Sequence, residues 1–154
     1  MGHVDLSCEY KLDDGELCMR GGPIMLGYYK DPEATAEVLD AEGWFHTGDL
    51  ARVDEEGYYY MTGRKKNLII LASGENVSPE ELEGIVGKCE AVKECVVKEM
   101  GKKIGVVVYC DEDKQQQVRD FITEANRTLP LYKRMVTEFS AQPLPRNAMG
   151  KLLR

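Results

Sequence analysis

Apolar residues recur at helical spacing in the last third of the chain, and this pattern predicts an amphipathic helix. The residues that form this apolar face are Val118, Phe121, Ile122, Ala125 and Leu129. Asp113 is expected to begin the helix and Pro130 to end it. We expect a strand over 136–140 to follow, and an irregular tail over 143–154.

The segment before this helix predicts another helix and several strands. Ser78, Pro79 and Glu81 have the spacing of a capping box, with Ser78 as the cap and Glu81 reaching back, so a helix is expected to run to about residue 88. Apolar runs predict strands over 68–71, 92–98 and 104–110. Together these elements predict a small α+β domain, with helices packed on one face of a mixed or antiparallel sheet.

Residues 1–62 have a different pattern, with short strands and turns around one helix. A turn at Asp13-Asp14-Gly15 should join strands over 6–11 and 16–20, and a turn over 54–57 should join strands over 50–53 and 58–61. Asp31 followed by Pro32 predicts the start of a short helix that ends near residue 39. These residues contain too few apolar side chains to close a core, so we expect 1–62 to be the edge of a larger domain and 63–154 to be a separate, smaller domain.

Composition excludes several classes of function. The 154 residues carry a formal net charge of −7, and such an acidic chain is a poor candidate for binding nucleic acid through its phosphates. The longest apolar runs, over 68–72 and 104–109, are too short to cross a membrane, and the first residues do not resemble a secretory signal. We therefore expect a cytoplasmic protein.

Cysteine and histidine usage gives no indication of a metal centre. The five cysteines include no C-x-x-C pair, which favours free, reduced thiols. The two histidines, His3 and His46, have no second His or Cys at metal-ligand spacing. No metal site is predicted.

Two segments contain candidate chemistry. Gly150-Lys151 suggests a phosphate-binding loop, but Pro145 and Leu152 occupy positions where such a loop needs Gly and Ser or Thr. Lys151 could still present its charge to phosphate or carboxylate oxygens, although a solvated lysine has the same pattern. Asp49, after Gly48, should lie at the mouth of a strand, where its carboxylate could bind a sugar diol or simply cap a turn.

Five ordered segments together resemble the C-terminal portion of the adenylate-forming acyl-CoA synthetase superfamily, which includes luciferases and peptide-synthetase adenylation domains. They are Gly15-Glu16-Leu17 with Gly27-Tyr28-Tyr29 and Pro32-Glu33-Ala34-Thr35; Phe45-His46-Thr47-Gly48-Asp49; Gly63-Arg64-Lys65-Lys66 through Glu81-Leu82-Glu83; Leu129-Pro130-Leu131-Tyr132; and Pro145 to Lys151. Met135 departs from the proline that many members carry there.

This resemblance implies a two-step reaction on a fatty or related carboxylic acid. The acid attacks ATP in the presence of Mg²⁺ to give an acyl-adenylate and pyrophosphate, and the thiol of CoA then displaces AMP. The family's glycine-rich phosphate loop and acyl pocket belong to an N-terminal domain that these 154 residues do not contain. The chain alone is therefore expected to be inactive.

The resemblance also implies a role for particular residues. Asp49 would bind the ribose hydroxyls, Arg64 would support the same nucleotide, and Lys66 would be the hinge between the domains. Lys151 would be the catalytic lysine of adenylation, and a lysine acetyltransferase and deacetylase could regulate it. The CoA and pantetheine contacts would be Ser73, Gly74, Glu75, Lys133 and Arg134.

Two alternatives remain open at this stage. The acceptor could be the pantetheine of a carrier protein, as in adenylation domains of peptide synthetases. The chain could also be a stand-alone, non-catalytic module that binds CoA or a nucleotide.

Overall fold

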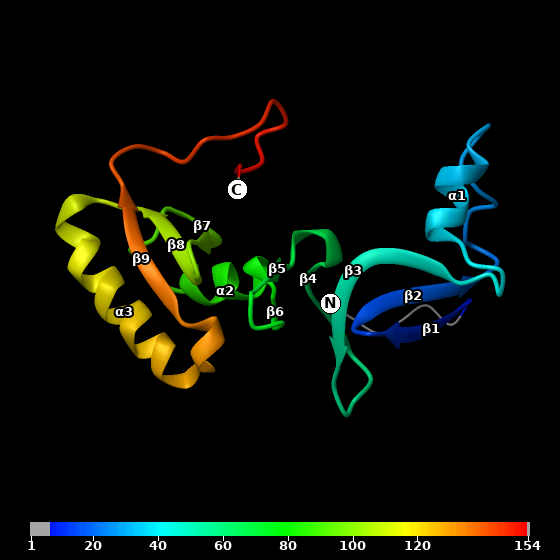
Figure 1. Cartoon of the computed structure of the whole chain (residues 1–154), viewed down its shortest axis with the longest axis horizontal. Helices are drawn as coiled ribbons and strands as arrows, with labels where there is room; N and C mark the ends of the chain where they lie inside the picture. The colour runs from blue at the N-terminus through cyan, green and yellow to red at the C-terminus, as the bar shows by residue number, and fades with distance from the viewer. Residues whose placement is uncertain (1–6, 154) are drawn as a thin grey trace. The chain divides into compact units, whose positions relative to one another are not determined.

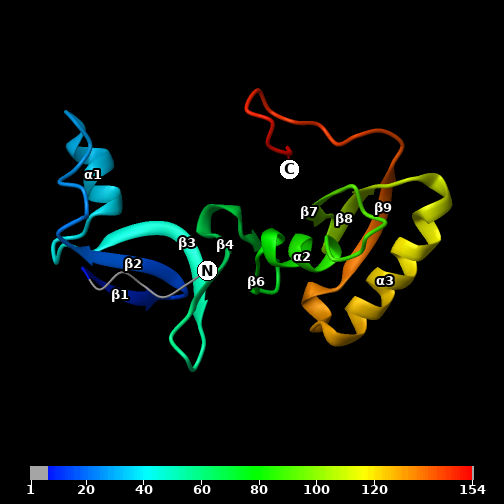
Figure 2. The same cartoon turned by 180° about the vertical axis from the view of Figure 1, so that it is seen from behind.

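The computed structural model describes residues 7–153. The chain forms two compact units, residues 1–66 and 67–154, which are coloured from blue to green and from green to red in Figures 1 and 2. The sequence analysis divided the chain after residue 62. The assignment of the first unit to the edge of a larger domain stays a prediction.

The first unit is a four-stranded antiparallel sheet in the order β1-β2-β3-β4. Its strands are β1 (Cys8–Asp13), β2 (Glu16–Gly21), β3 (Phe45–Val53) and β4 (Tyr59–Arg64). Asp14 and Gly15, with φ angles of 47° and 80°, form the two-residue turn of the first hairpin. The predicted hairpin is confirmed, although Leu6, where its first strand was expected to begin, lies outside the described residues.

The only helix described in this unit, α1 (Pro32–Val38), begins where the sequence predicted. The Asp31 side chain accepts a hydrogen bond from the Ala34 N–H at 3.0 Å, as an N-cap does. No residue of α1 is buried. Within 7–66, the buried apolar side chains are Cys18, Trp44 and Ala51, a small core for a sheet of four strands.

The second unit combines a small hairpin, a three-stranded sheet and two α-helices. Its strands are β5 (Ile69–Ile70), β6 (Asn76–Val77), β7 (Glu94–Met100), β8 (Lys103–Tyr109) and β9 (Met135–Ser140). Its α-helices are α2 (Pro79–Val86) and α3 (Gln115–Thr128), and its short 3-10 turns are η2 (Glu112–Lys114) and η3 (Leu131–Lys133). A further 3-10 turn, η1 (Lys65–Asn67), includes the boundary between the two units. The sheet is mixed, because β8 pairs antiparallel with β7 and parallel with β9.

Both helices of this unit pack on the same face of the sheet. Ile104, Val106 and Val108 alternate along β8, so they share a face. They form one buried cluster with Leu82 and Val86 of α2 and with Val118 and Ile122 of α3. The views in Figures 1 and 2 show α3 running beside β9. The predicted α+β class, with helices on one face, is confirmed.

Local details of the two α-helices of this unit differ from the sequence prediction. The helix expected to start at Asp113 begins at Gln115, because the chain first makes the tighter η2 turn. Ser78 caps α2 as expected by accepting from the Glu81 N–H at 3.4 Å, but both carboxylate oxygens of Glu81 accept hydrogen bonds from Lys133.

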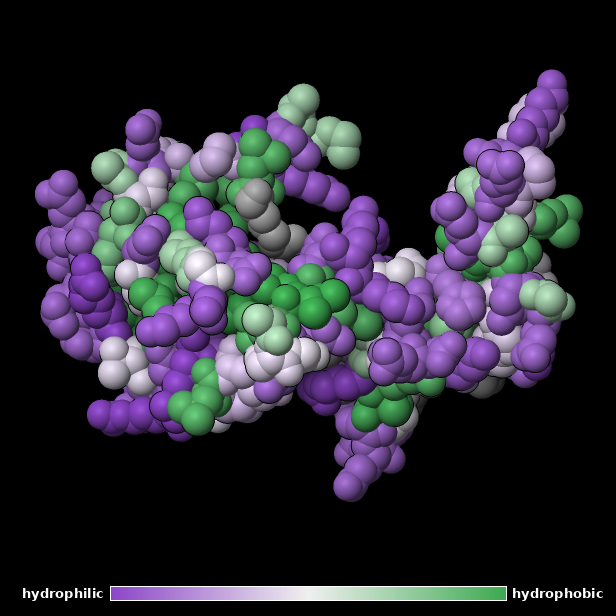
Figure 3. Space-filling view, viewed as in Figure 1, coloured by the Kyte–Doolittle hydropathy of each residue, from purple (hydrophilic) through white to green (hydrophobic). Residues whose placement is uncertain are grey.

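The surface has no single apolar face in the view of Figure 3, where green patches are separated by purple polar side chains over both units. Among residues 7–153, no helix has both the length and the hydropathy that a membrane span requires. All five cysteines lie in the described part of the chain and are free.

Candidate functional site

The segment Thr47-Gly48-Asp49 forms a bulge inside β3, not the turn before a strand that the sequence analysis expected. Glu16 and Cys18 are two residues apart in β2, whereas their partners in β3 are four residues apart. Gly48 adopts a φ of 71°, which an L side chain disfavours. The sequence interpretation failed here because the bulge depends on pairing with β2, which is distant along the chain.

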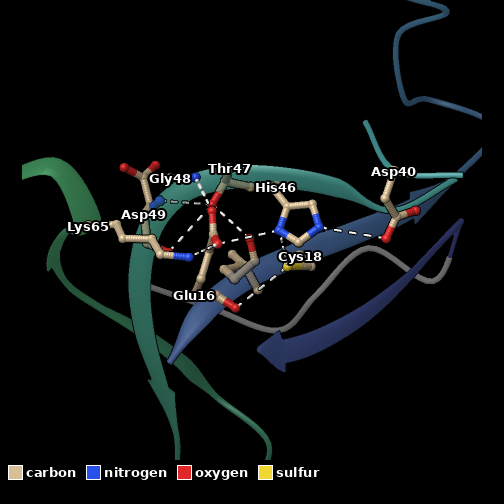
Figure 4. A network of polar contacts seen from close by, with 9 residues as sticks. Glu16, Cys18, Asp40, His46, Thr47, Gly48, Asp49 and Lys65 are labelled. Carbon is tan, nitrogen blue, oxygen red and sulfur yellow. Dashed lines mark hydrogen bonds and ion pairs between the residues drawn. The ribbon is translucent and has the colours of Figure 1, made fainter. Parts of the chain in front are cut away.

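The carboxylate of Glu16, which is 4% exposed, fills the space behind this bulge (Figure 4). It accepts hydrogen bonds from the Gly48 N–H at 2.8 Å and from Lys65 Nζ at 2.9 Å. Burial by itself would raise the pKa of Glu16, but the hydrogen bonds from Lys65, Gly48 and His46 outweigh it and hold the pKa below its ordinary value. Glu16 is therefore the charged centre that fixes the bulge.

His46 links Glu16 to other polar groups of the first unit. Its Nδ1 atom lies 3.3 Å from Glu16 Oε2 and 3.4 Å from Cys18 Sγ, and its Nε2 atom lies 3.6 Å from Asp40 Oδ2. Asp13, Cys18 and His46 each offer one atom that could bind a metal ion, and these three atoms lie within 4.8 Å of one another. The Lys65 ammonium beside Glu16 already supplies the positive charge here, so this chemistry suits a hydrogen-bonded network better than a cation site.

Asp49 points away from this network, as Figure 4 shows, and forms an ion pair with Arg64. The two residues are directly opposite each other in β3 and β4, and Arg64 Nε lies 2.7 Å from Asp49 Oδ1. The Asp49 N–H donates to Thr47 Oγ1 at 3.0 Å, and Thr47 Oγ1 donates to the Leu17 carbonyl at 2.8 Å. The bulge therefore holds the Asp49 carboxylate beside a guanidinium, with its second oxygen available to a ligand.

Lys66, the predicted hinge, lies between two anchored residues. Lys65 is tied to Glu16 in the first unit, and hydrogen bonding to Glu16 raises the pKa of Lys65. Asn67 donates from Nδ2 to Glu80 Oε1 of the second unit at 2.6 Å. Along the chain, the first unit ends at Lys66 and the second begins at Asn67.

Lys151, the predicted catalytic lysine, is exposed on a hydrogen-bonded loop at the end of the second unit. The side-chain oxygen of Asn147 accepts from the N–H groups of Met149 and Lys151, both at 3.0 Å. Arg146 ties the loop to the sheet by donating to Glu94 Oε1 at 2.6 Å. The described part of the tail forms no helix or strand, as the sequence analysis expected, and these hydrogen bonds hold its loop in place.

The loop that contains Ser73, Gly74 and Glu75 joins β5 to β6, and Gly74 has a φ of 96°. Ser73 lines a pocket of about 300 Å³ together with Arg134. One carboxylate oxygen of Glu75 is buried without a hydrogen-bond partner among the described residues. The structure thus brings Ser73 and Arg134, two predicted CoA contacts, to one place.

Lys133 has a different environment from its neighbour Arg134. Its side chain is 18% exposed, and its Nζ atom donates to both carboxylate oxygens of Glu81, at 2.7 and 2.9 Å. This bidentate contact joins the first turn of α2 to η3. The position of Lys133 near CoA phosphates stays a prediction.

Comparison with known proteins identifies the family. Residues 66–154, more than half of the chain, match the family model described as AMP-binding enzyme C-terminal domain. The chain belongs to this family. The matched region contains Lys66, the CoA candidates and Lys151.

Relatives of this AMP-binding enzyme C-terminal domain match the first unit as well. A long-chain-fatty-acid–CoA ligase of Escherichia coli O157:H7 is 38% identical over 146 residues, and a 4-coumarate–CoA ligase of Pinus taeda is 33% identical over 146 residues; each match covers 91% of this chain. These matches cover 25% and 26% of the relatives, so the chain spans about a quarter of their length.

A solved structure with the same fold is the O-succinylbenzoate coenzyme A synthetase of Bacillus subtilis in complex with ATP and magnesium. It aligns with a TM-score of 0.79 and 31% identity, over 99% of this chain and 34% of that one. The anthranilate CoA ligase in complex with anthranoyl-AMP aligns with a TM-score of 0.77 and 29% identity, over 98% of this chain and 32% of that one.

Two residues in supporting positions were missed by the sequence analysis. Glu16 and Asn147 were each part of a motif, but neither was given a role. Glu16 stands directly before the apolar residues Leu17 and Cys18, and this position could have signalled a buried carboxylate. Nothing in the local sequence indicates that its partners are Gly48 and Lys65.

Proposed function

We propose that this chain is the C-terminal part of an ATP-dependent, AMP-forming carboxylic acid–CoA ligase. The reaction converts a carboxylic acid, ATP and CoA into an acyl-CoA, AMP and pyrophosphate through an acyl-adenylate. A fatty acid is the proposed acid, because a long-chain-fatty-acid–CoA ligase is among the relatives with 38% identity. The chain by itself is proposed to be inactive, since it spans about a quarter of such relatives.

The observation that carries this proposal is the Asp49–Arg64 pair on the bulge of β3. A carboxylate with a free oxygen can accept hydrogen bonds from the two hydroxyls of a ribose. The adjacent guanidinium, 2.7 Å from the other oxygen, holds the carboxylate in its orientation. Because this carboxylate is already paired with Arg64, these two residues do not fit a magnesium site.

Lys151 is proposed to stabilise the adenylation step. Negative charge builds up on the phosphate and carboxylate oxygens in that transition state, and a cation placed beside them lowers the barrier. The loop around Asn147 supports this role, because it fixes the Lys151 backbone and leaves the side chain exposed. Acetylation of the exposed Lys151 by a lysine acetyltransferase would remove the charge and stop this step.

Lys66 is proposed to be the pivot that lets the second unit serve both half-reactions. The anchors on Lys65 and Asn67 support this position, since they leave Lys66 between them. Changing Lys66 to Pro would fix its φ angle and should impair the passage from adenylation to thioester formation. Unaltered turnover of both half-reactions would contradict this assignment.

The test uses the longer protein that contains this chain. Lys151→Ala should lower the rate of acid-dependent exchange between pyrophosphate and ATP by roughly 10²–10³-fold, as for other charge-stabilising groups. Thioester formation from a preformed acyl-adenylate and CoA should stay close to the wild-type rate. Lys114→Ala, which removes an exposed lysine in η2, is the matched control. Equal losses in both half-reactions would overturn the role of Lys151, and wild-type protein without exchange for any acid would overturn the proposed function.

A further inference from the structure

The last segment of the chain, drawn in red in Figures 1 and 2, returns from the end of β9 to the start of β7. Glu94, the first residue of β7, holds this segment at two points. Its Oε2 atom accepts a hydrogen bond from the Leu144 N–H at 2.7 Å, and its Oε1 atom accepts one from Arg146 Nη2 at 2.6 Å. Both carboxylate oxygens of Glu94 therefore bind the tail, at residues 50 and 52 positions further along the chain.

The Arg146 guanidinium extends this contact to the peptide bond that precedes Lys151. While Nη2 donates to Glu94, Nη1 donates to the Gly150 carbonyl oxygen at 2.7 Å. On the other side of the same peptide bond, the Lys151 N–H donates to Asn147 Oδ1 at 3.0 Å. Because a peptide bond is planar, these two contacts together fix the direction in which the chain enters Lys151.

Backbone contacts close the loop between these points. The Asn147 N–H donates to the Lys151 carbonyl at 2.8 Å, and Arg146 and Leu152 form an isolated antiparallel bridge. The loop is therefore a short closed turn, and Glu94 attaches it to the sheet through Arg146. A displacement of the Arg146 guanidinium would move the whole turn, with Lys151 on it.

The charges of this arrangement favour Lys151 as a free cation. The side chain of Glu94 is 16% exposed, and its hydrogen bonds, first from Arg146 and then from the Leu144 N–H, hold the pKa of Glu94 below its ordinary value. Glu94 is thus ionised at neutral pH and paired with Arg146. Among residues 7–153, none of the ion pairs includes Lys151. The turn is therefore held by a charged contact that leaves the ammonium of Lys151 unneutralised.

We propose that Glu94 is a positioning residue for Lys151, and that it acts through Arg146 and the Gly150 carbonyl. The proposal rests on the proposed role of Lys151 in adenylation. Glu94 and Arg146 touch no reacting group in it, and they set where the turn lies relative to β7. Placement matters because a shift of about 1 Å in a group that stabilises a transition state can cost roughly 10²-fold in rate.

Two substitutions release the turn without removing Lys151. Arg146→Lys keeps the positive charge but replaces two separated nitrogens by one, so it cannot hold Glu94 and the loop carbonyl in the same geometry. Glu94→Gln keeps an acceptor oxygen but removes the charge that holds Arg146. Arg127→Lys is the matched control, because Arg127 also contacts a glutamate at 2.6 Å, Glu124, on the exposed surface of α3.

The first test is hydrogen–deuterium exchange of the 154-residue chain, measured in peptides that cover residues 147–153. Arg146→Lys and Glu94→Gln should each speed exchange there by about tenfold, because the turn loses its attachment to the sheet, whereas α3 should exchange as in the wild type. Arg127→Lys should leave exchange over 147–153 unchanged. Unchanged exchange over 147–153 in the two turn variants would overturn the proposal. An equal increase across α3 and β7 would also overturn it, since it would show a general loss of stability.

The second test uses the longer protein and compares the two half-reactions. Arg146→Lys should lower acid-dependent exchange between pyrophosphate and ATP by about 10–100-fold and leave thioester formation from a preformed acyl-adenylate near the wild-type rate. Combined with Lys151→Ala, the same substitution should cause no further loss of exchange, because a residue that acts through Lys151 then has no charge to position.

The outcomes of this second test separate the proposal from the proposed function. The same fold loss from Arg146→Lys in both Lys151 backgrounds, or equal losses in both half-reactions, would overturn the positioning role alone. Absence of exchange in the wild type would overturn the proposed ligase instead, and the hydrogen exchange result would still decide whether Glu94 and Arg146 fix the turn.

Discussion

Replacing Glu16 by Gln should destabilise the first unit and identify the carboxylate as the group that holds the bulge in β3. The substitution keeps the size of a side chain that is 4% exposed but removes its charge. It weakens the contacts with Lys65 Nζ at 2.9 Å and with the Gly48 N–H at 2.8 Å. Hydrogen bonds to charged groups contribute about 1.5–3 kcal/mol. Because the Lys65 side chain is 53% exposed and solvent screens that pair, we expect a loss of about 1–2 kcal/mol.

Urea unfolding monitored by tryptophan fluorescence measures this loss of stability in the first unit. Trp44, the only tryptophan of the chain, is buried in the first unit beneath Lys11 and Arg20, whose charged groups lie 4.4 and 4.5 Å from its ring centroid. A loss of about 1–2 kcal/mol should lower the urea midpoint by about 0.5–1 M at ordinary denaturant sensitivity. Glu55→Gln, an exposed glutamate in the turn between β3 and β4, is the matched control and should unfold like the wild type.

The same measurement at different pH values tests the cause. The pKa of Glu16 is lowered in the folded protein, so its contribution to stability is complete above the unfolded pKa of about 4.3 and is lost as the pH falls through the folded pKa. The difference between wild type and Glu16→Gln should therefore be largest near pH 7 and shrink below pH 4 or so. Coincident unfolding curves at neutral pH, or a difference that is unchanged in acid, would refute this reasoning.

Two further predictions concern the second unit. Lys133→Met should destabilise the second unit by about 1–3 kcal/mol, because Glu81 loses its bidentate partner. Circular dichroism during urea unfolding measures this loss of stability. A Lys133→Met variant as stable as the control Lys114→Met would contradict the prediction. Burial raises the pKa of Cys95 to about 11, so only about one Cys95 thiol in a thousand is ionised at pH 8. Peptide mapping after brief iodoacetamide treatment should therefore find Cys95 unmodified in the folded chain and modified in urea. Rapid alkylation of Cys95 in the folded chain would show that its thiol is not shielded.

Local signals predicted much of the fold. The turn at Asp14 and Gly15, the caps Asp31 and Ser78, and the apolar face of α3 each depend on residues within a few positions of one another. Such features follow from backbone preferences and periodicity, which a single sequence displays directly.

The supporting contacts of the candidate site could not be predicted in the same way. Lys65 and Glu16 are separated by 49 residues along the chain, and Lys133 and Glu81 by 52. The parallel pairing of β8 with β9, which brings Lys103 beside Arg134, depends on how α3 crosses between the two strands. These contacts follow from topology. The sequence singled out Asp49 and Lys151 as candidate site residues, but it did not indicate the neighbours that hold them.

The contacts on either side of Lys66 have a consequence for the hinge that we propose there. Lys65 is hydrogen-bonded to Glu16 of the first unit, and Asn67 is hydrogen-bonded to Glu80 of the second. If Lys66 is the hinge, a rotation about its φ and ψ torsions would leave both side-chain contacts intact. The energetic cost of such a rotation would then come from the backbone of one residue and from opening the short η1 turn that contains it.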